Sequence, residues 1–348
     1  MTEEKPMFNN RRQRSRGFTL IELMVAMFIG LLLLGGLIQI FLANRAAYRV
    51  MEGAGFMQEN MRFAVDRIAQ SMRLADHWGT LERSKIVGAG TGATLCTADW
   101  ARNLTQGVWA VDGAATLPPA LAGCTSITSA NYQPGTDVIM VRYAGPDTIA
   151  PATTLTATQY YIRVATGRNT GFMYLGNAPN TQVVAEARQY LIMPFNAEMF
   201  WVRRCSDPGA NGTCGDSDDG DTPIAVPTLM RSYIAGDGSW TSEAVAEGME
   251  QLQIEYQVMN RQWMNATAAA SFSAASGGSP WDYMTGARIA GVMRSSQRDP
   301  SFPADTRTFN LSGDTTAYTP PTAAQKFMRV AYEANVVIRN RVRPAPPI

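Results

Sequence analysis

The sequence predicts an α+β fold in which one long N-terminal α-helix packs on an antiparallel β-rich globular domain with long loops. Three observations lead to this prediction. Residues 18–43 form an apolar run, residues 44–76 repeat apolar side chains at helical spacing, and short alternating runs follow from about Gly79. We expect a basic leader at 1–17, a membrane helix at 18–43, its amphipathic continuation at 44–78, the β-rich domain at 79–343 and a tail at 344–348.

Composition and charge restrict the function of the chain. With 348 residues, 46% of them hydrophobic, the chain is long enough to bury a substantial core. Its formal net charge is +1, so no overall basic field is present to bind nucleic acid. The stretch "RRQRSR" at 11–16 precedes the apolar run. Positive charge before a membrane segment keeps the N-terminus cytoplasmic, so we expect the remainder to be exported.

The apolar run is long enough to span a bilayer. "FTLIELMVAMFIGLLLLGGLIQIFLA", residues 18–43, contains one charged side chain, Glu22. At 1.5 Å per residue this run exceeds the bilayer core of about 30 Å, and it is longer than the apolar core of a secretory signal. A carboxylate in hydrocarbon is costly unless it is paired, so Glu22 is a candidate functional residue.

The second half of the helix carries an apolar stripe. Its members recur three or four residues apart and are Met57, Met61, Ala64, Ile68, Met72 and Ala75. Such a stripe predicts a helix lying on an apolar surface. The protein's own globular domain is the expected surface, and a partner protein is the alternative.

Alternating runs predict the strands of the globular domain. "QLQIEYQV" at 251–258 and "MRVAYEANVVIRN" at 328–340 place apolar side chains on one face, as in half-buried antiparallel strands. Further candidate strands begin near residues 137, 158, 189, 227 and 287.

The four cysteines predict disulfides. Cys96, Cys124, Cys205 and Cys214 all lie on the exported side, where disulfides persist. Proximity favours Cys96 with Cys124 and Cys205 with Cys214, but spacing alone leaves three pairings open. A zinc site is the weaker alternative, because His77 is the single histidine and no CxxC pair occurs.

An acidic loop raises the question of calcium. "CGDSDDGDTP" at 214–223 places four carboxylates around Gly220: Asp216, Asp218, Asp219 and Asp221. Oxygen-rich loops of this kind bind calcium outside cells. The loop is not an EF-hand, because its glycine falls one place early and no glutamate closes it. A solvated acidic loop is the favoured interpretation, and no other cofactor is expected.

The sequence does not predict an enzyme. A phosphate-binding loop, a dinucleotide fingerprint and a cluster of metal-ligating histidines are all missing from the sequence. A Ser-His-Asp hydrolase would depend on His77, next to Trp78 at the end of the helical stripe. Packing at a helix end is the better interpretation of that histidine.

"RGFTLIELMVAMFIG" resembles the class III signal of type IV pilins and type II secretion pseudopilins. The resemblance implies that a prepilin peptidase cleaves between Gly17 and Phe18 and methylates the new amine of Phe18, leaving the helix on the mature protein. It also implies that Glu22 pairs with the N-terminal amine of a neighbouring subunit in a filament. The alternative is that Glu22 lies at the headgroup level of the membrane.

Three later stretches extend the resemblance to PilW-type minor pilins: "EGMEQLQIEYQV", "ARIAGVMRSS" and "MRVAYEANVVIRNR". This resemblance implies a minor pilin that primes type IV pilus assembly and joins a tip complex for adhesion and twitching motility. Its partners would be the prepilin peptidase, other minor pilins, the major pilin and a PilY-type tip adhesin.

The same resemblance implies a single-pass location in the inner membrane with the globular domain in the periplasm, followed by the pilus tip at the cell surface. The large domain and its long loops suit a tip position, where one end of the subunit is uncovered. A GspJ-like pseudopilin of type II secretion is the near alternative. A signal-anchored periplasmic enzyme is the more distant one.

Overall fold

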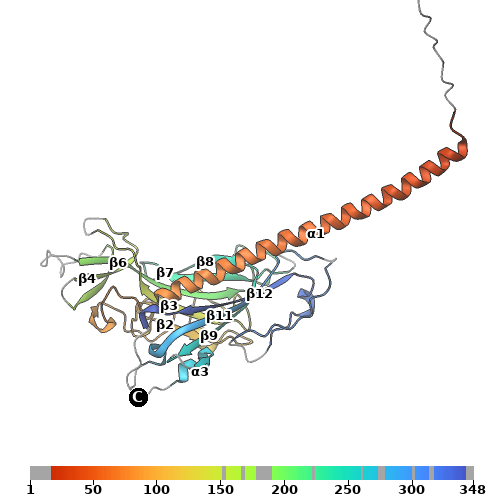
Figure 1. The fold of residues 1–348 in the computed structure, drawn as a ribbon. Helices are drawn as coiled ribbons and strands as arrows, with labels where there is room; N and C mark the ends of the chain where they lie inside the picture. Colours follow the sequence, from red (N-terminus) through yellow and green to blue (C-terminus); the bar gives the residue numbers. More distant parts are fainter. Residues whose placement is uncertain are drawn as a thin grey trace, which may run out of the picture. The chain divides into compact units, whose positions relative to one another are not determined.

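The computed structural model of the chain describes residues 17–150, 154–165, 169–177, 190–221, 224–259, 262–272, 279–299, 302–312 and 317–341. Contacts divide the chain into two compact units, Met1–Glu52 and Gly53–Ile348. Helix α1 (Leu20–Leu74) contributes residues to both units (Figure 1).

In the first unit, the described residues are helical from Leu20 onward and carry an exposed apolar surface. Every residue from Gly17 to Arg45 is exposed. Among the described residues, α1 is the one helix that is long and apolar enough to cross a membrane. Because water disfavours an apolar surface of this size, lipid or other apolar helices must cover it. The N-terminal helix therefore has the length and the apolar surface of a membrane anchor.

In the second unit, α1 packs on the globular domain through the predicted stripe. All six stripe residues are buried, and Met61, Ala64, Ile68 and Met72 have no exposed surface. The other side of this part of α1 keeps Phe56 and Phe63 more than half exposed. The sequence-based interpretation of the stripe as a surface for the protein's own domain is thus confirmed.

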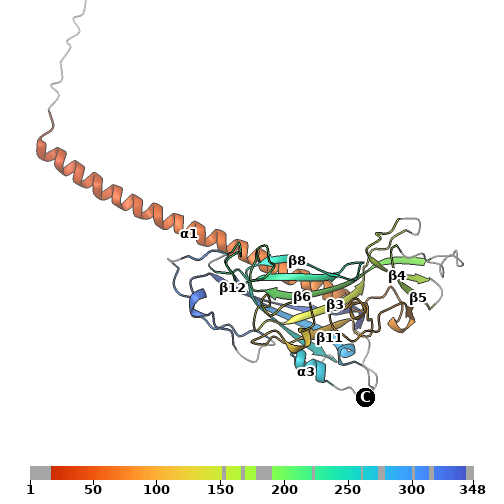
Figure 2. The same ribbon diagram turned by 180° about the vertical axis from the view of Figure 1, so that it is seen from behind.

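Two sheets form the β-rich part (Figures 1 and 2), and the predicted α+β fold is confirmed. The eight-stranded sheet contains β1 (Ile86–Val87), β2 (Val108–Val111), β3 (Val138–Ala144), β4 (Tyr160–Ala165), β5 (Gly171–Leu175), β6 (Tyr190–Arg203), β7 (Thr228–Ile234) and β8 (Trp240–Glu247). The four-stranded sheet contains β9 (Met249–Val258), β10 (Gln262–Met264), β11 (Met284–Arg294) and β12 (Arg329–Val337). Two short α-helices accompany them, α2 (Ala98–Ala101) and α3 (Ala266–Ser271).

The strands run in the orders β1-β5-β4-β6-β3-β2 and β10-β9-β11-β12, with β7 on β6 and β8 on β7. All pairs between these strands are antiparallel except β1 with β5, which is parallel. The 14-residue strand β6 is long enough to pair with β4 through its first part and with β3 and β7 through its second part.

Strand β3 of the eight-stranded sheet is buried on both faces. Ile139 and Val141 of β3 lie in one core with the buried stripe of α1 and strands of the other sheet. The neighbouring residues Val138 and Met140 lie in a second core. Because successive side chains of a strand point to opposite faces, both faces of β3 are covered, and Arg142 is the one charged residue of the strand.

The segment after α1 supplies the second core. Trp100, Leu104, Leu121 and Ile127 are buried there against the sheet. A disulfide between Cys96 and Cys124 closes this segment, and a second joins Cys205 and Cys214. These are the two pairings that sequence proximity favours. The segment that contains Trp100, Leu104, Leu121 and Ile127 therefore covers one face of the sheet.

Arg142 of β3 fastens that covering segment. Its side chain is completely buried and donates hydrogen bonds to the carbonyl oxygens of Trp100, Ala101 and Gln106 at 2.8–3.1 Å. The guanidinium also lies 4.5 Å from the ring centroid of Trp100. Burial lowers the pKa of Arg142 to about 9. The guanidinium thus replaces its lost water contacts with backbone carbonyls and an aromatic face.

Strand β12 lies at the edge of its sheet and is less buried than its alternation predicts. Val336 and Ile338 are buried, whereas Tyr332 is 40% exposed. Strand β9 matches its prediction: Leu252, Ile254, Tyr256 and Val258 are all buried. The difference arises because β9 pairs on both sides, whereas β12 pairs with β11 alone among the described strands.

Candidate functional site

The predicted cleavage bond lies just before α1. Gly17, Phe18 and Thr19 are outside the helix, and Phe18 is 86% exposed. A Cβ atom added to Gly17 would meet no described atom within 4 Å. A peptidase needs access to a backbone that is not held in a helix, so the geometry of the Gly17–Phe18 bond is compatible with cleavage.

Glu22 lies in the first turn of α1 and caps that helix together with Thr19. The backbone N–H of Glu22 donates to Oγ1 of Thr19, and the backbone N–H of Thr19 donates to Oε2 of Glu22, both at 3.3 Å. The Thr19 hydroxyl also donates to Oε2 at 3.3 Å. This reciprocal arrangement is a capping box, with Thr19 at the N-cap and Glu22 three residues later.

The capping box gives Glu22 a local role besides the expected pairing between subunits. Both bonds that Glu22 accepts use Oε2, so Oε1 is not needed for the cap. A carboxylate in the first turn also interacts favourably with the positive end of the helix dipole. Reasoning from the sequence missed Thr19, although the spacing Thr-x-x-Glu is itself a capping signal.

Two of the three stretches that resemble PilW-type minor pilins meet at a buried ion pair. Glu250 of β9 and Arg329 of β12 have exposed side-chain fractions of 3% and 0%. Arg329 Nε donates to Glu250 Oε2 at 2.5 Å, and Nη2 donates to Oε1 at 3.0 Å. The two strands are separated by β11, so the pair links β9 and β12 across β11.

The remaining stretch, "ARIAGVMRSS", adds Arg294 of β11 to this cluster. Its guanidinium lies 3.8 Å from Glu250 and 4.3 Å from the ring centroid of Phe327. Desolvation lowers the pKa of Arg294, and Glu250 acts in the opposite direction. Asp305 lies 3.7 Å from Arg329. The sequence showed the charged residues of these stretches but not that they meet.

The Arg-Asn-Arg sequence that ends the C-terminal stretch, "MRVAYEANVVIRNR", also has a structural role. The side-chain amide of Asn340 donates to the carbonyl oxygens of Leu74 at 3.4 Å and Ala75 at 3.1 Å. These carbonyls belong to the end of α1, where the helix leaves its last carbonyl groups unsatisfied. Asn340 therefore caps the C-terminus of α1 from the far end of the chain.

The structure brings three of the four loop aspartates together. Oxygen atoms of Asp216, Asp218 and Asp219 all lie within 4.8 Å of one another. Asp221 is outside this group: its Oδ2 accepts bonds from Ser206 and from the backbone N–H of Val226.

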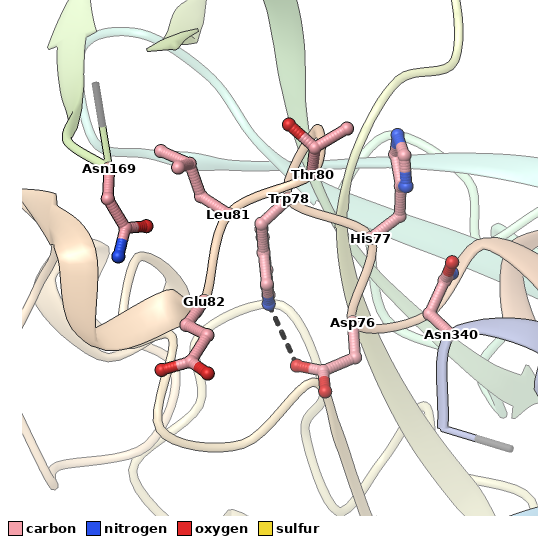
Figure 3. Close-up of a pocket in the computed structure, with 8 residues that line it drawn as sticks. All are labelled: Asp76, His77, Trp78, Thr80, Leu81, Glu82, Asn169 and Asn340. Carbon is pink, nitrogen blue, oxygen red and sulfur yellow. Dashed lines mark hydrogen bonds between the residues drawn. The ribbon is translucent and has the colours of Figure 1, made fainter. Parts of the chain in front are cut away.

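A polar pocket of about 390 Å³ lies at the end of α1 (Figure 3). Its lining comprises Asp76, His77, Trp78, Thr80, Leu81, Glu82, Asn169 and Asn340. The indole N–H of Trp78 donates to Asp76 at 2.8 Å, and the His77 ring points away from that carboxylate. Asp76 and Thr80 adopt left-handed backbone conformations, with φ values of 61° and 73°. The described lining includes neither serine nor cysteine, so it gives no support to the hydrolase alternative.

Comparison with protein families matches two parts of the chain. Residues 213–340 match the family described as "Type IV Pilus-assembly protein W", and residues 12–38 match the "Prokaryotic N-terminal methylation motif". Neither the curated proteins nor the solved structures gave a match.

The two matched parts contain the residues whose contacts are described above. The first includes Glu250, Arg294, Arg329 and Asn340, and the second includes the Gly17–Phe18 bond and Glu22. Together they indicate a structural, non-enzymatic protein that interacts with pilus components and with the prepilin peptidase. In these two parts the chain is similar to type IV pilin-like proteins, with residues 213–340 resembling the PilW type of minor pilin.

Proposed function

We propose that this minor pilin primes assembly of a type IV pilus and enters a tip complex with other minor pilins and a PilY-type adhesin. One observation carries the proposal. Glu22 lies in the first turn of an exposed apolar helix, four residues after Phe18, in a chain whose residues 213–340 match the PilW family.

Cleavage would create the partner that Glu22 needs. Cutting between Gly17 and Phe18 leaves a positively charged amine four residues before Glu22. When apolar helices stack with an axial offset, the amine of one subunit reaches the carboxylate of the next. Away from water an unpaired carboxylate is costly, so assembly is favoured in the register that pairs the two charges.

The proposed location follows from the charge pattern. The basic leader stays in the cytoplasm and the globular domain is exported to the periplasm, where the two disulfides form. During assembly the exposed surface of α1 exchanges lipid for the helices of neighbouring subunits. Adhesion and twitching motility then depend on the tip complex that the protein helps to build.

Mass spectrometry of the protein from envelopes tests the processing step. We expect the mature chain to begin with N-methylphenylalanine at Phe18. A chain that still begins at Met1 would refute the proposal.

Substitution of Glu22 tests the assembly step in a piliated host whose own copy of the gene is deleted. We expect Glu22→Gln to be inserted and cleaved normally but to support few pili. Glu59→Gln is the matched control, since it removes the same charge from an exposed position of the same helix. Normal pilus numbers with Glu22→Gln would show that the carboxylate is incidental to assembly.

Crosslinking in envelopes separates a pilus role from a secretion role. We expect other minor pilins and the tip adhesin to be captured with the chain. Capture of secretion pseudopilins in their place would favour the GspJ-like alternative.

Labelling of isolated pili tests the tip position. A tip protein gives signal at filament ends, whereas a shaft subunit gives signal along the length.

A further inference from the structure

The acidic loop is held in place by covalent and polar contacts. It connects β6 with β7, and the disulfide between Cys205 and Cys214 closes its first part. Asn131 ties it to a distant segment, because the Asn131 amide donates to the carbonyl of Gly212 and accepts from the N–H of Cys214, both at 2.9 Å. The backbone that bears the aspartates after Cys214 is therefore held in place by these contacts.

The spacing of three carboxylates fits a single calcium ion. Oxygen atoms of Asp216, Asp218 and Asp219 lie within 4.8 Å of one another. Calcium binds oxygen ligands at roughly 2.3–2.6 Å, so two oxygens on one ion are at most about 5 Å apart. The three carboxylates already meet this limit.

Asp219 supplies a second, independent observation. Its side chain is only 6% exposed, and its Oδ2 accepts the backbone N–H of Gly215 at 2.6 Å. Its Oδ1 is buried and has no hydrogen-bond partner among the described residues. A buried carboxylate oxygen normally has a donor or a cation beside it, because losing water without replacement is costly. The orphaned oxygen belongs to one of the three clustered carboxylates.

The contacts of the other two carboxylates do not neutralise the cluster. The Asn211 amide donates to Asp216 at 2.7 Å and to Asp218 at 3.1 Å, and the N–H of Ala210 donates to Asp218 at 3.1 Å. These donors are uncharged. In the part of the chain that the structure describes, no lysine or arginine forms an ion pair with any of the three carboxylates.

We propose that Asp216, Asp218 and Asp219 bind one calcium ion. The ligands are hard carboxylate oxygens, which calcium prefers, and the nearby thiols are consumed in a disulfide and cannot bind zinc. A bound ion satisfies the buried oxygen of Asp219 and removes the mutual repulsion of three negative charges. It therefore stabilises the connection between β6 and β7 and protects it from proteolysis.

Calcium binding by the full chain in detergent tests the proposal. Bound metal is first removed with a chelator, and equilibrium dialysis against labelled calcium then measures binding. We expect one saturable site with a dissociation constant of about 0.1–1 mM, the range of extracellular calcium modules. Asp219→Asn and Asp216→Asn should each weaken binding about tenfold or more. Because Asp216 is exposed, Asp216→Asn should fold normally. It therefore tests calcium binding even if Asp219→Asn fails to fold.

Asp147→Asn is the matched control, since Asp147 is exposed and lies in a different loop. It should bind calcium like the original chain. In all chains that bind the ion, calcium should slow proteolytic cleavage within residues 214–221 and raise the unfolding temperature. Absence of saturable binding up to about 10 mM calcium would overturn the proposal, as would equal binding by Asp216→Asn and Asp147→Asn. Magnesium binding of equal strength at these residues would contradict the choice of ion.

Discussion

Arg329 holds Glu250 through two hydrogen bonds, at 2.5 and 3.0 Å, in the interior of the globular domain. The two side chains come from strands β12 and β9 and are 0% and 3% exposed. Arg294 of β11 lies beside them. The cluster therefore connects the three stretches by which the sequence resembles PilW-type minor pilins.

Removing one member of this pair should destabilise the domain strongly. Arg329→Met leaves the carboxylate of Glu250 buried with Arg294 and the Tyr318 hydroxyl as its neighbours. Loss of one partner of a buried pair costs about 3–5 kcal/mol. Urea unfolding of the full chain, followed by tryptophan fluorescence, measures the change. The exposed Arg298→Met is the control and should unfold like the original chain. Equal midpoints for the two variants would contradict the importance of the pair.

Glu198 should make the stability of the domain sensitive to acid. This residue of β6 accepts bonds from Arg67 at 2.8 Å and Ser71 at 2.5 Å, both on α1, and also pairs with Arg231. Desolvation raises the pKa of Glu198, but Arg231, Ser71 and Arg67 together outweigh it, so the net pKa is lowered from 4.5.

Because the pKa of Glu198 is lower in the folded state, the ionised group stabilises the fold above the ordinary value of 4.5. That contribution is lost as the pH falls from there through the lower folded value. We expect Glu198→Gln to cost about 3 kcal/mol at neutral pH and to flatten the decline in stability at acid pH. Unfolding midpoints measured between neutral pH and about pH 3 test this, and Glu59→Gln should keep the original pH profile. An equally steep acid decline in Glu198→Gln would show that other groups cause it.

The two disulfides should contribute unequally to stability. Cys96 and Cys124 are 28 residues apart, whereas Cys205 and Cys214 are 9 apart. In the chain-entropy treatment, a crosslink that closes the longer loop stabilises by about 3–4 kcal/mol and the shorter by about 2–3 kcal/mol. Paired Cys→Ala substitutions compared by denaturant unfolding test the order. A larger loss from the Cys205–Cys214 pair would count against this account.

Thr19→Val separates the helix cap from the charge of Glu22. The variant loses the Thr19 hydroxyl bonds, and loss of an N-cap costs about 1 kcal/mol, but the carboxylate remains. We expect cleavage at Gly17 to persist and pilus numbers to stay near normal, in contrast to Glu22→Gln. Pilus counts by electron microscopy provide the measurement. If Thr19→Val assembles as poorly as Glu22→Gln, the cap and not the charge is what assembly requires.

Asn340 should stabilise the end of α1. Asn340→Ala removes the two bonds to the Leu74 and Ala75 carbonyls and should cost about 1 kcal/mol. Asn340→Asp should cost more, because an ionised carboxylate has no N–H to donate and repels those oxygens. Thermal unfolding compares both with Asn310→Ala, an exposed control. Indistinguishable unfolding temperatures for the three variants would exclude a capping role.

Some of this structure was predictable because it depends on neighbouring residues. The long apolar helix, the buried stripe from Met57 to Ala75 and the core face of β9 all follow from periodicity, which local geometry imposes. Both disulfides join the cysteines that are nearest in sequence. The Thr19–Glu22 cap also follows from local sequence, because Thr-x-x-Glu is the spacing of a capping box.

Other features depend on residues that only folding brings together. Strand β3 is buried on both faces because the segment around Trp100 and Leu121 covers the face opposite α1. The sequence near β3 does not predict that this segment packs there. Glu250 meets Arg329 across 79 residues, and Asn340 meets Ala75 across 265. Of the four loop aspartates, three lie close together in the fold, whereas Asp221 accepts a hydrogen bond from Ser206. Periodicity reports which side of an element is apolar, whereas partners distant in the chain are selected by how whole elements pack.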